Sequence, residues 1–217
     1  MNFGVSPLPG NERALSVHIF QPNWHNELCI QYLQTRYKKY VEGLGTEQPN
    51  PEVPEGMDWD QYDRSSVYVL VSRGKTFRTG CRLINGRNGQ KITVDQSLIR
   101  SPNHAEISRT VQGGTGDSED SLNMLYLYVG VIRHALWNMG YDELYANTRV
   151  ALSRILTYLF GPQVIEVLGP VNTEVKNGRV IKLVPIRITR SVVMPLFDDF
   201  VEARLPGFSF SHLRLVA

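Results

Sequence analysis

The sequence predicts an α/β/α sandwich with a mixed, mostly antiparallel central sheet. Residues 66–72 form a continuous apolar run, a glycine turn at Gly74 follows, and residues 76–84 have the composition of a partner strand. Between residues 122 and 139, apolar side chains recur every three or four positions, which is the period of an amphipathic helix. An antiparallel hairpin followed by alternating helices and strands is typical of layered α/β architectures.

The segment before the hairpin predicts a strand, a helix and a long loop. Residues 14–20 mix aliphatic and polar side chains as a first strand does, and residues 25–41 carry an apolar helical stripe that ends before Gly43. Residues 46–63 contain three prolines and many acidic side chains, so we expect a loop with at most a short helix.

After the hairpin, a strand is expected at residues 105–111 and a glycine-rich run at 113–116, before the long helix that ends at Gly140. The rest predicts a strand, a helix and two further strands joined by a turn at Asn177-Gly178, at residues 141–148, 150–158, 164–168 and 180–188. In the helix at residues 150–158, the side chains expected to face inward are Leu152, Ile155, Leu156 and Leu159.

Length and composition predict one domain over residues 1–217, with a flexible N-terminus at residues 1–10. The net charge of +2 gives no support for nucleic-acid binding. Only two cysteines are present, no His/Cys spacing suggests a metal, and no apolar run reaches eighteen residues. Nothing resembles a signal peptide, so we expect a cytoplasmic protein without stable membrane association.

Ionisable residues interrupt segments that otherwise have the composition of buried strands. Asp60 and Asp63 lie in the acidic loop, Arg82 lies in the second hairpin strand, and a Glu-x-Ser-Arg block starts at Glu106. Because an isolated buried charge is costly, each must be exposed, paired or functional. In a regular strand Glu106 and Ser108 share one face and Arg109 lies on the other, and a bulge would change that assignment.

The order of these blocks resembles the N-acyl-homoserine-lactone synthases, the autoinducer synthases of quorum sensing, which have a GNAT-like acyltransferase fold. The resemblance covers residues 36–169. The matching positions are Arg36, Tyr40 (where the family usually has Phe), Asp60, Asp63, Arg82, Glu106, Ser108, Arg109, Thr148 and Arg154. Two departures are Thr46, where the family has tryptophan, and Asn85-Gly86, where the hairpin ends differently.

The resemblance implies acylation of the amine of S-adenosylmethionine by a thioester on acyl carrier protein or coenzyme A. The lactone then closes with release of methylthioadenosine, and no permanently bound cofactor is implied. Glu106 is the candidate general base, because the attacking amine must lose a proton. Strand amides beside Val111 are the candidate donors to the thioester oxygen.

The remaining matched residues are expected to bind substrate. Asp60 and Asp63 would supply a negative field for the sulfonium and ammonium groups, and Arg36 would hold the substrate carboxylate. Arg82 and Arg109 are alternatively expected to pair with the aspartates and to fix the loop. Ser108, Thr148 and Tyr40 complete the candidate set, although Thr148 would also suit a helix cap.

An acidic carrier protein needs a basic face, and the candidate contributors are Lys38, Lys39, Arg149 and Arg154. Two other functions remain open. An N-acyltransferase acting on a different amine would explain Thr46 and the altered hairpin end. A catalytically silent carrier-binding protein would have kept the fold without needing Glu106 or Arg109. Acyl chain length, donor type and oligomeric state do not follow from one sequence.

Overall fold

The computed structural model describes residues 2–4, 15–23, 25–87, 92–114, 119–176, 178–206 and 214–216. The chain divides into two compact units. Unit 1 comprises Met1–Leu83, Arg109–Val131 and Ser209–Ala217, and unit 2 comprises Ile84–Ser108 and Ile132–Phe208. The single-domain assignment stays a prediction. Most of the predicted flexible N-terminus and of the glycine-rich run after Gly114 lies outside the described residues.

In unit 1 the strands follow the order β10-β1-β2-β3-β4. Their bounds are Arg214–Val216 (β10), Asn2–Gly4 (β1), Leu15–Phe20 (β2), Ser66–Arg73 (β3) and Thr76–Asn85 (β4). Strand β3 lies between β2 and β4, and nearly all of its residues are buried, as its continuous apolar run predicts. The loop over residues 46–62 precedes a single short 3₁₀ turn, Asp63–Ser65, as expected.

Helices cover both faces of the unit 1 strands. Helix α1 (Glu27–Tyr37) packs Tyr32 and Leu33 against Tyr68 and Leu70 of β3. Helix α2 (Asp120–Ile132) approaches the other face so closely that a Cβ on Gly130 would lie 2.6 Å from a Val17 methyl group. Within this unit the predicted helix–sheet–helix layering is present.

Two of the three predicted helices, those at residues 25–41 and 122–139, end in a π-helical segment rather than in regular α-helix. The segment Lys38–Gly43 continues α1. At the other end of this helix, the side-chain oxygen of Asn26 accepts hydrogen bonds from the amides of Leu28 and Cys29 and so caps its start. Arg133–Asn138 continues α2. Such wide turns shift the side chains that follow them around the helix axis.

Strand β5 (His104–Gln112) passes through both units, changing from unit 2 to unit 1 at Arg109. In unit 2, its first part pairs in parallel with β6 (Glu143–Arg149), and β6 pairs antiparallel with β9 (Arg179–Thr189). The short β7 (Glu166–Val167) and β8 (Asn172–Lys176) both pair antiparallel with β9. A mixed, mostly antiparallel sheet is therefore confirmed.

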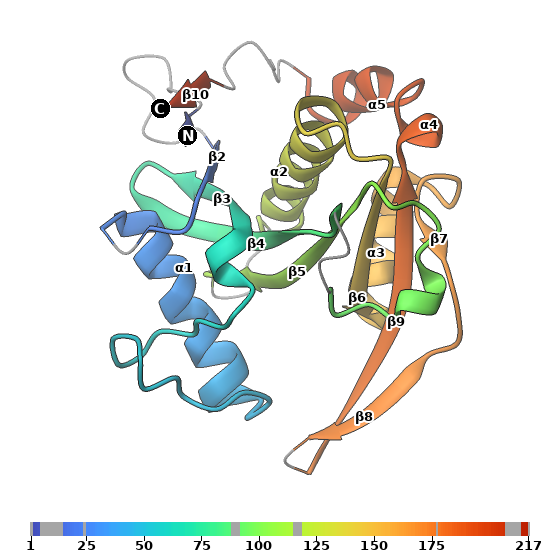
Figure 1. The fold of residues 1–217 in the computed structure, drawn as a ribbon. Helices are drawn as coiled ribbons and strands as arrows, with labels where there is room; N and C mark the ends of the chain where they lie inside the picture. The colour runs from blue at the N-terminus through green and yellow to red at the C-terminus, as the bar shows by residue number, and fades with distance from the viewer. Residues whose placement is uncertain are drawn as a thin grey trace. The chain divides into compact units, whose positions relative to one another are not determined.

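Helix α3 (Val150–Phe160) follows β6 directly and buries Leu156 and Phe160. Ile155, which we expected to face inward, is 44% exposed, so this prediction is wrong: the buried edge of α3 runs through Ser153, Leu156 and Phe160 instead. Strand β8 was not predicted, because its Asn-Thr-Glu-Val-Lys sequence has little apolar content. It forms a hairpin with β9 that extends past the last β6 pairing, Arg149 with Leu183 (Figure 1).

The sequence also gave no indication of two helices after β9. They are α4 (Arg190–Val193) and α5 (Phe197–Arg204). Aromatic contacts hold α5 in unit 2, with Phe197 against Trp137 at 4.9 Å and Phe200 stacked on Phe160 at 4.7 Å between ring centroids.

Candidate functional site

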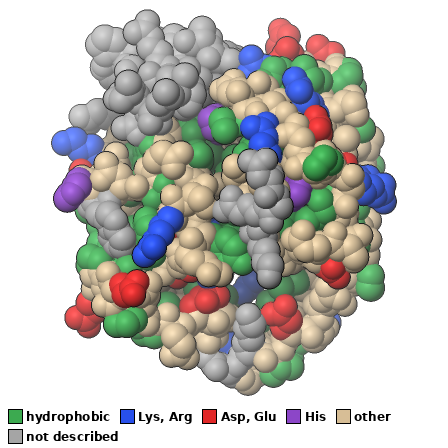
Figure 2. All heavy atoms as spheres, viewed as in Figure 1, with side chains coloured by type: hydrophobic (Ala, Val, Ile, Leu, Met, Phe, Trp, Pro, Cys, Tyr) green, Lys and Arg blue, Asp and Glu red, His purple; other side chains and the backbone are tan. Residues whose placement is uncertain are grey.

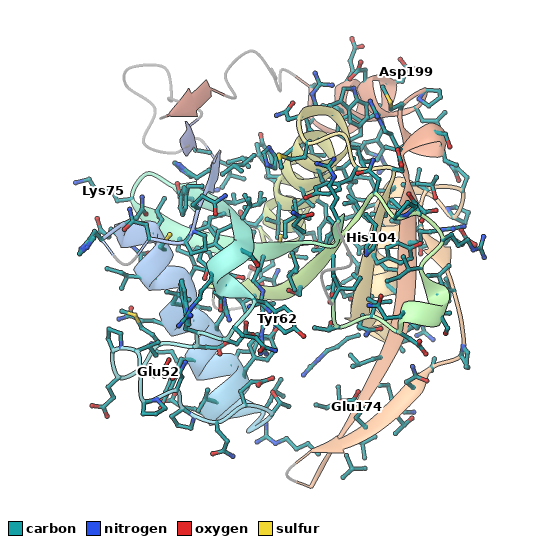
Figure 3. All side chains as sticks on the ribbon, in the orientation of Figure 1. Glu52, Tyr62, Lys75, His104, Glu174 and Asp199 are labelled. Carbon is teal, nitrogen blue, oxygen red and sulfur yellow. The ribbon has the colours of Figure 1, made fainter. Side chains whose placement is uncertain are left out.

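Seven ionisable side chains of unit 1 form one ion-pair network, which we call the charged cluster. Its members are Arg36, Glu47, Asp58, Asp60, Asp63, Arg82 and Arg109. They come from α1, the acidic loop, β4 and β5, so the chain reaches this place four times. Tyr62, labelled in Figure 3, lies on the loop just before β3, and its ring lies 5.5 Å from the Arg82 guanidinium.

Arg36 forms the buried centre of the charged cluster. Its guanidinium donates to both carboxylate oxygens of Asp63, at 2.7 and 3.1 Å, and through Nε to Asp58 at 2.9 Å. The side chain has no exposed surface. In this structure the guanidinium of Arg36 pairs with two aspartates of the acidic loop, and its predicted contact with a substrate carboxylate stays a prediction.

Asp63 is the acceptor around which the loop closes. Besides Arg36, it accepts hydrogen bonds from the Tyr68 hydroxyl at 2.8 Å and from its own loop, through the Asp60 amide at 2.8 Å. Arg82 lies 3.1 Å away. Burial alone would raise the pKa of Asp63, but the guanidiniums of Arg36 and Arg82 outweigh burial and lower it to about 2. Asp63 is therefore held in its ionised form by the arginines around it, and its predicted contact with a substrate stays a prediction.

Asp60 lies at the more open side of the charged cluster. Arg82 and Arg109 both donate to it, the latter at 3.2 Å. Burial would raise the pKa of Asp60, but the guanidinium of Arg82 outweighs burial and lowers it. Arg82 and Arg109 therefore do pair with the aspartates, which was one of the two alternatives left open by the sequence. Asp60 remains 24% exposed, and Glu47, which accepts from Arg109 at 2.9 Å, remains 34% exposed.

The solvent exposure of the side chains thus increases from the buried side of the charged cluster to its open side. Arg36 and Arg82 are 0% and 1% exposed, whereas the two most exposed members are carboxylates. With four acids and three arginines, the seven residues carry a formal charge of −1. The open side of the network is therefore suited to a cation.

Arg109 combines a strained backbone with several partners. It has φ = 53°, the left-handed region, and it is the one non-glycine residue with positive φ within the described ranges. Its guanidinium lies 4.8 Å from the Tyr40 ring centroid, besides its contacts to Glu47 and Asp60. Burial would lower the pKa of Arg109, but Asp58 and Glu47 raise it. Strand β5 is thus distorted at Arg109, close to the place where the sequence left a bulge open as an alternative to a regular strand.

Glu106, the candidate general base, lies in the unit 2 part of β5 and is 1% exposed. Its carboxylate accepts a hydrogen bond from the Thr93 amide, at 2.5 Å, and another from the Thr93 hydroxyl. Ser108 is half-buried. Thr148, also in unit 2, is 5% exposed, and among the described residues its hydroxyl has no hydrogen-bond partner. It does not cap α3, whose N-cap is Arg149.

The proposed basic face for a carrier protein divides between the units. Lys38 belongs to unit 1, and Arg149 and Arg154 belong to unit 2; all three are exposed. The ammonium of Lys39 donates to the Thr110 carbonyl at 2.7 Å, and the contact of all four residues with a carrier protein stays a prediction. On the face shown in Figure 2, the described basic and acidic side chains are interspersed.

Sequence reasoning missed three residues that complete the cluster or its surroundings: Tyr32, Glu47 and Tyr68. Tyr32 precedes Arg36 by one helical turn, a spacing that would have revealed it. Tyr68 and Glu47 are brought to the cluster only by the fold. Thr46, in place of the tryptophan, ends the π-helical turn by donating from its amide and its hydroxyl to the Tyr40 carbonyl, at 2.8 and 3.2 Å.

Two possible site types find no support in the described ranges. No group of three potential metal ligands comes together there. In the same ranges, no helix is both long enough and apolar enough to cross a membrane.

Comparison with solved structures places the fold. The AHL synthase LasI superposes with a TM-score of 0.68 at 20% identity, over 86% of this chain and 96% of LasI. BjaI, a CoA-dependent acyl-homoserine lactone synthase solved with SAM and isopentyl-CoA, gives 0.61 at 20% identity, over 83% and 86% of the two chains. A chimera of spermidine N-acetyltransferase SpeG from Vibrio cholerae with hSSAT gives 0.52 at 14% identity, over 82% and 98%.

No family model matches the sequence, and no curated protein matches it. The structural matches therefore carry the comparison, and at these identities they establish the fold. The chain has the GNAT-like fold of the AHL synthases, so the predicted fold is confirmed.

Proposed function

We propose that this protein synthesises N-acyl-homoserine lactones. The amine of S-adenosylmethionine attacks an acyl thioester carried by acyl carrier protein or coenzyme A, and the thiol leaves. The carboxylate of the acylated product then displaces methylthioadenosine to close the lactone. The observation that carries the proposal is the graded charged cluster, whose open side presents Asp60 and Glu47. A sulfonium that also bears an ammonium group fits such a surface.

The cluster supports binding, and the rest of β5 supports chemistry. Glu106 is the general base of the proposal, because two donors from Thr93 fix the orientation of its carboxylate. The amides beside Val111 are the donors to the thioester oxygen, where negative charge develops. Fold similarity to the AHL synthases adds weight and does not by itself assign the reaction.

A second acceptor is favoured by one feature of the chain. Thr46 occupies the place of the tryptophan and closes the helix end, so the acceptor surroundings differ from the family pattern. A carboxylate-rich opening also suits other cationic amines. In that case the protein is an N-acyltransferase with a different amine substrate.

The test is turnover of the purified protein with S-adenosylmethionine and a set of acyl thioesters on carrier protein and on coenzyme A. Mass spectrometry follows methylthioadenosine and acyl lactone, and both must form. Asp60→Asn is expected to raise KM for S-adenosylmethionine about tenfold, whereas Glu55→Gln, an exposed acid of the same loop, leaves it unchanged. Thioester consumption only with another amine identifies the second function, and no turnover with any acceptor refutes both.

A further inference from the structure

Three side chains of the α1 segment hold two successive backbone carbonyls of β5. The Tyr32 hydroxyl donates to the Arg109 carbonyl at 3.0 Å. The Lys39 ammonium and the Tyr40 hydroxyl both donate to the Thr110 carbonyl, at 2.7 and 3.2 Å. All five residues belong to unit 1. The contacts therefore tie one short stretch of strand backbone to one helix.

A regular strand does not present its backbone in this way. Successive carbonyls of a β-strand point in opposite directions, so one helix cannot receive two in a row. Here the first of the two belongs to Arg109, with φ = 53°. A left-handed residue turns the chain and brings the two carbonyls to one side. This conformation is costly for arginine, and it persists where its surroundings determine it.

The helix is built to reach both carbonyls. Tyr32, Arg36 and Tyr40 are spaced by four residues and so share one face of a helix. The π-helical turn Lys38–Gly43 lets the adjacent Lys39 and Tyr40 reach the same oxygen. The Tyr40 ring also lies against the Arg109 guanidinium, at 4.8 Å. The hydroxyl at this position is a departure, since the family pattern has Phe.

The direction of the carbonyls fixes that of the next amides. In a planar trans peptide unit the N–H points opposite to the C=O. When the carbonyls of Arg109 and Thr110 point toward α1, the N–H groups of Thr110 and Val111 both point away from it. We propose that Tyr32, Lys39 and Tyr40 are positioning residues that aim these two N–H groups jointly at the oxygen of the acyl thioester. This inference rests on the proposed acyl transfer and adds the device that orients its oxyanion donors.

The experiment compares the wild type with Tyr32→Phe, with Tyr40→Phe and with the double variant Lys39→Met/Tyr40→Phe. Controls are Tyr37→Phe and Lys75→Met. Tyr37 lies on the same helix, and no hydrogen bond among the described residues joins its hydroxyl to β5. Lys75 is exposed at the tip of the β3–β4 turn (Figure 3). For each protein, kcat, both KM values, thermal unfolding and amide hydrogen exchange of residues 109–112 are measured.

We expect the double variant to lose about tenfold or more in kcat, with both KM values within about twofold of wild type, because the lost interaction acts in the transition state. The Thr110 and Val111 amides should exchange faster than in either control. Leu28→Ala, which shortens a partly buried side chain of α1 that packs against the core, calibrates the effect of destabilisation alone. It should lower the unfolding temperature without lowering kcat.

Two results separate this inference from the proposed function. If the wild type forms lactone and the double variant keeps its kcat, or loses only what Leu28→Ala loses at equal destabilisation, the positioning role is refuted and the proposed function stands. If the wild type transfers no acyl group to any amine, the proposed function and this inference both fall.

Discussion

Replacing Arg36 by methionine should destabilise the protein far more than a comparable change at the surface. Methionine keeps much of the side-chain volume and removes the guanidinium. Asp63 would then retain Arg82 and Tyr68, while Asp58 would lose its contact to Arg36 Nε at 2.9 Å. Without the guanidinium, the buried carboxylates of Asp58 and Asp63 have fewer hydrogen bonds and less opposite charge to offset the cost of their burial.

The magnitude follows from burial. Arg36 and Asp63 are both 0% exposed, and breaking a buried pair by removing one partner costs about 3–5 kcal/mol. For a chain of this length, about 1 kcal/mol shifts the unfolding temperature by about 2–4 °C. Arg36→Met should therefore lower that temperature by on the order of 10 °C.

The matched control lies at the end of the same loop. Arg64 approaches Glu52 at 4.0 Å, with both side chains more than three quarters exposed, and such pairs contribute at most about 1 kcal/mol. Urea unfolding of the wild type, Arg36→Met and Arg64→Met gives the three free energies of unfolding. If Arg36→Met costs no more than Arg64→Met, the charged cluster does not anchor the acidic loop, and the reasoning fails.

Three further outcomes are expected. Folding lowers the pKa of Asp63 from 3.8 to about 2, so its ionised form adds about 2 kcal/mol to the free energy of unfolding above pH 4. This contribution is lost as the pH falls toward 2. In Asp63→Asn, the free energy of unfolding should therefore not show this decrease between pH 4 and pH 2. Thr148→Val should leave the free energy of unfolding unchanged or slightly increased, because a buried hydroxyl without a described partner is replaced by a methyl group of similar size; a clear decrease in urea unfolding would reveal a partner. Burial raises the pKa of the Cys29 thiol to about 12 and that of Cys81 as well, so a thiol reagent at pH 8 should label neither cysteine until urea unfolds the protein; fast labelling of the native state would contradict their burial.

Local patterns predicted most of the fold, and pairings distant in sequence account for what they missed. The run at residues 66–72 and the stripe at 122–139 each carry their periodicity within one window, so β3 and α2 were predicted. Strand β8 carries no such pattern, because most of its side chains are exposed and its pairing with β9 gives it its structure. The carbonyls at the distorted stretch of β5 are likewise bound by side chains distant in sequence, Tyr32, Lys39 and Tyr40, some 70 residues earlier in the chain.

The site shows the same division. The sequence identified Asp60, Asp63, Arg82 and Arg109 as residues that must be paired or functional, and the structure pairs all four. It did not separate the members that hold the loop from those that face solvent. Arg36 was expected at a substrate and lies at the buried centre, because burial is decided by how α1 packs on β3.

Stability alone does not account for a cluster of seven charges. Buried ion pairs can often be replaced by apolar side chains at no cost in stability, since desolvation offsets much of their attraction. What an apolar core cannot do is hold a loop rigidly while leaving carboxylates at its open side. Arg36 and Arg82 do the first through Asp63, and that leaves Asp60 and Glu47 partly exposed and oriented by Arg109. The buried arginines are thus explained by the exposed acids, and the cationic substrate that we propose would explain the exposed acids.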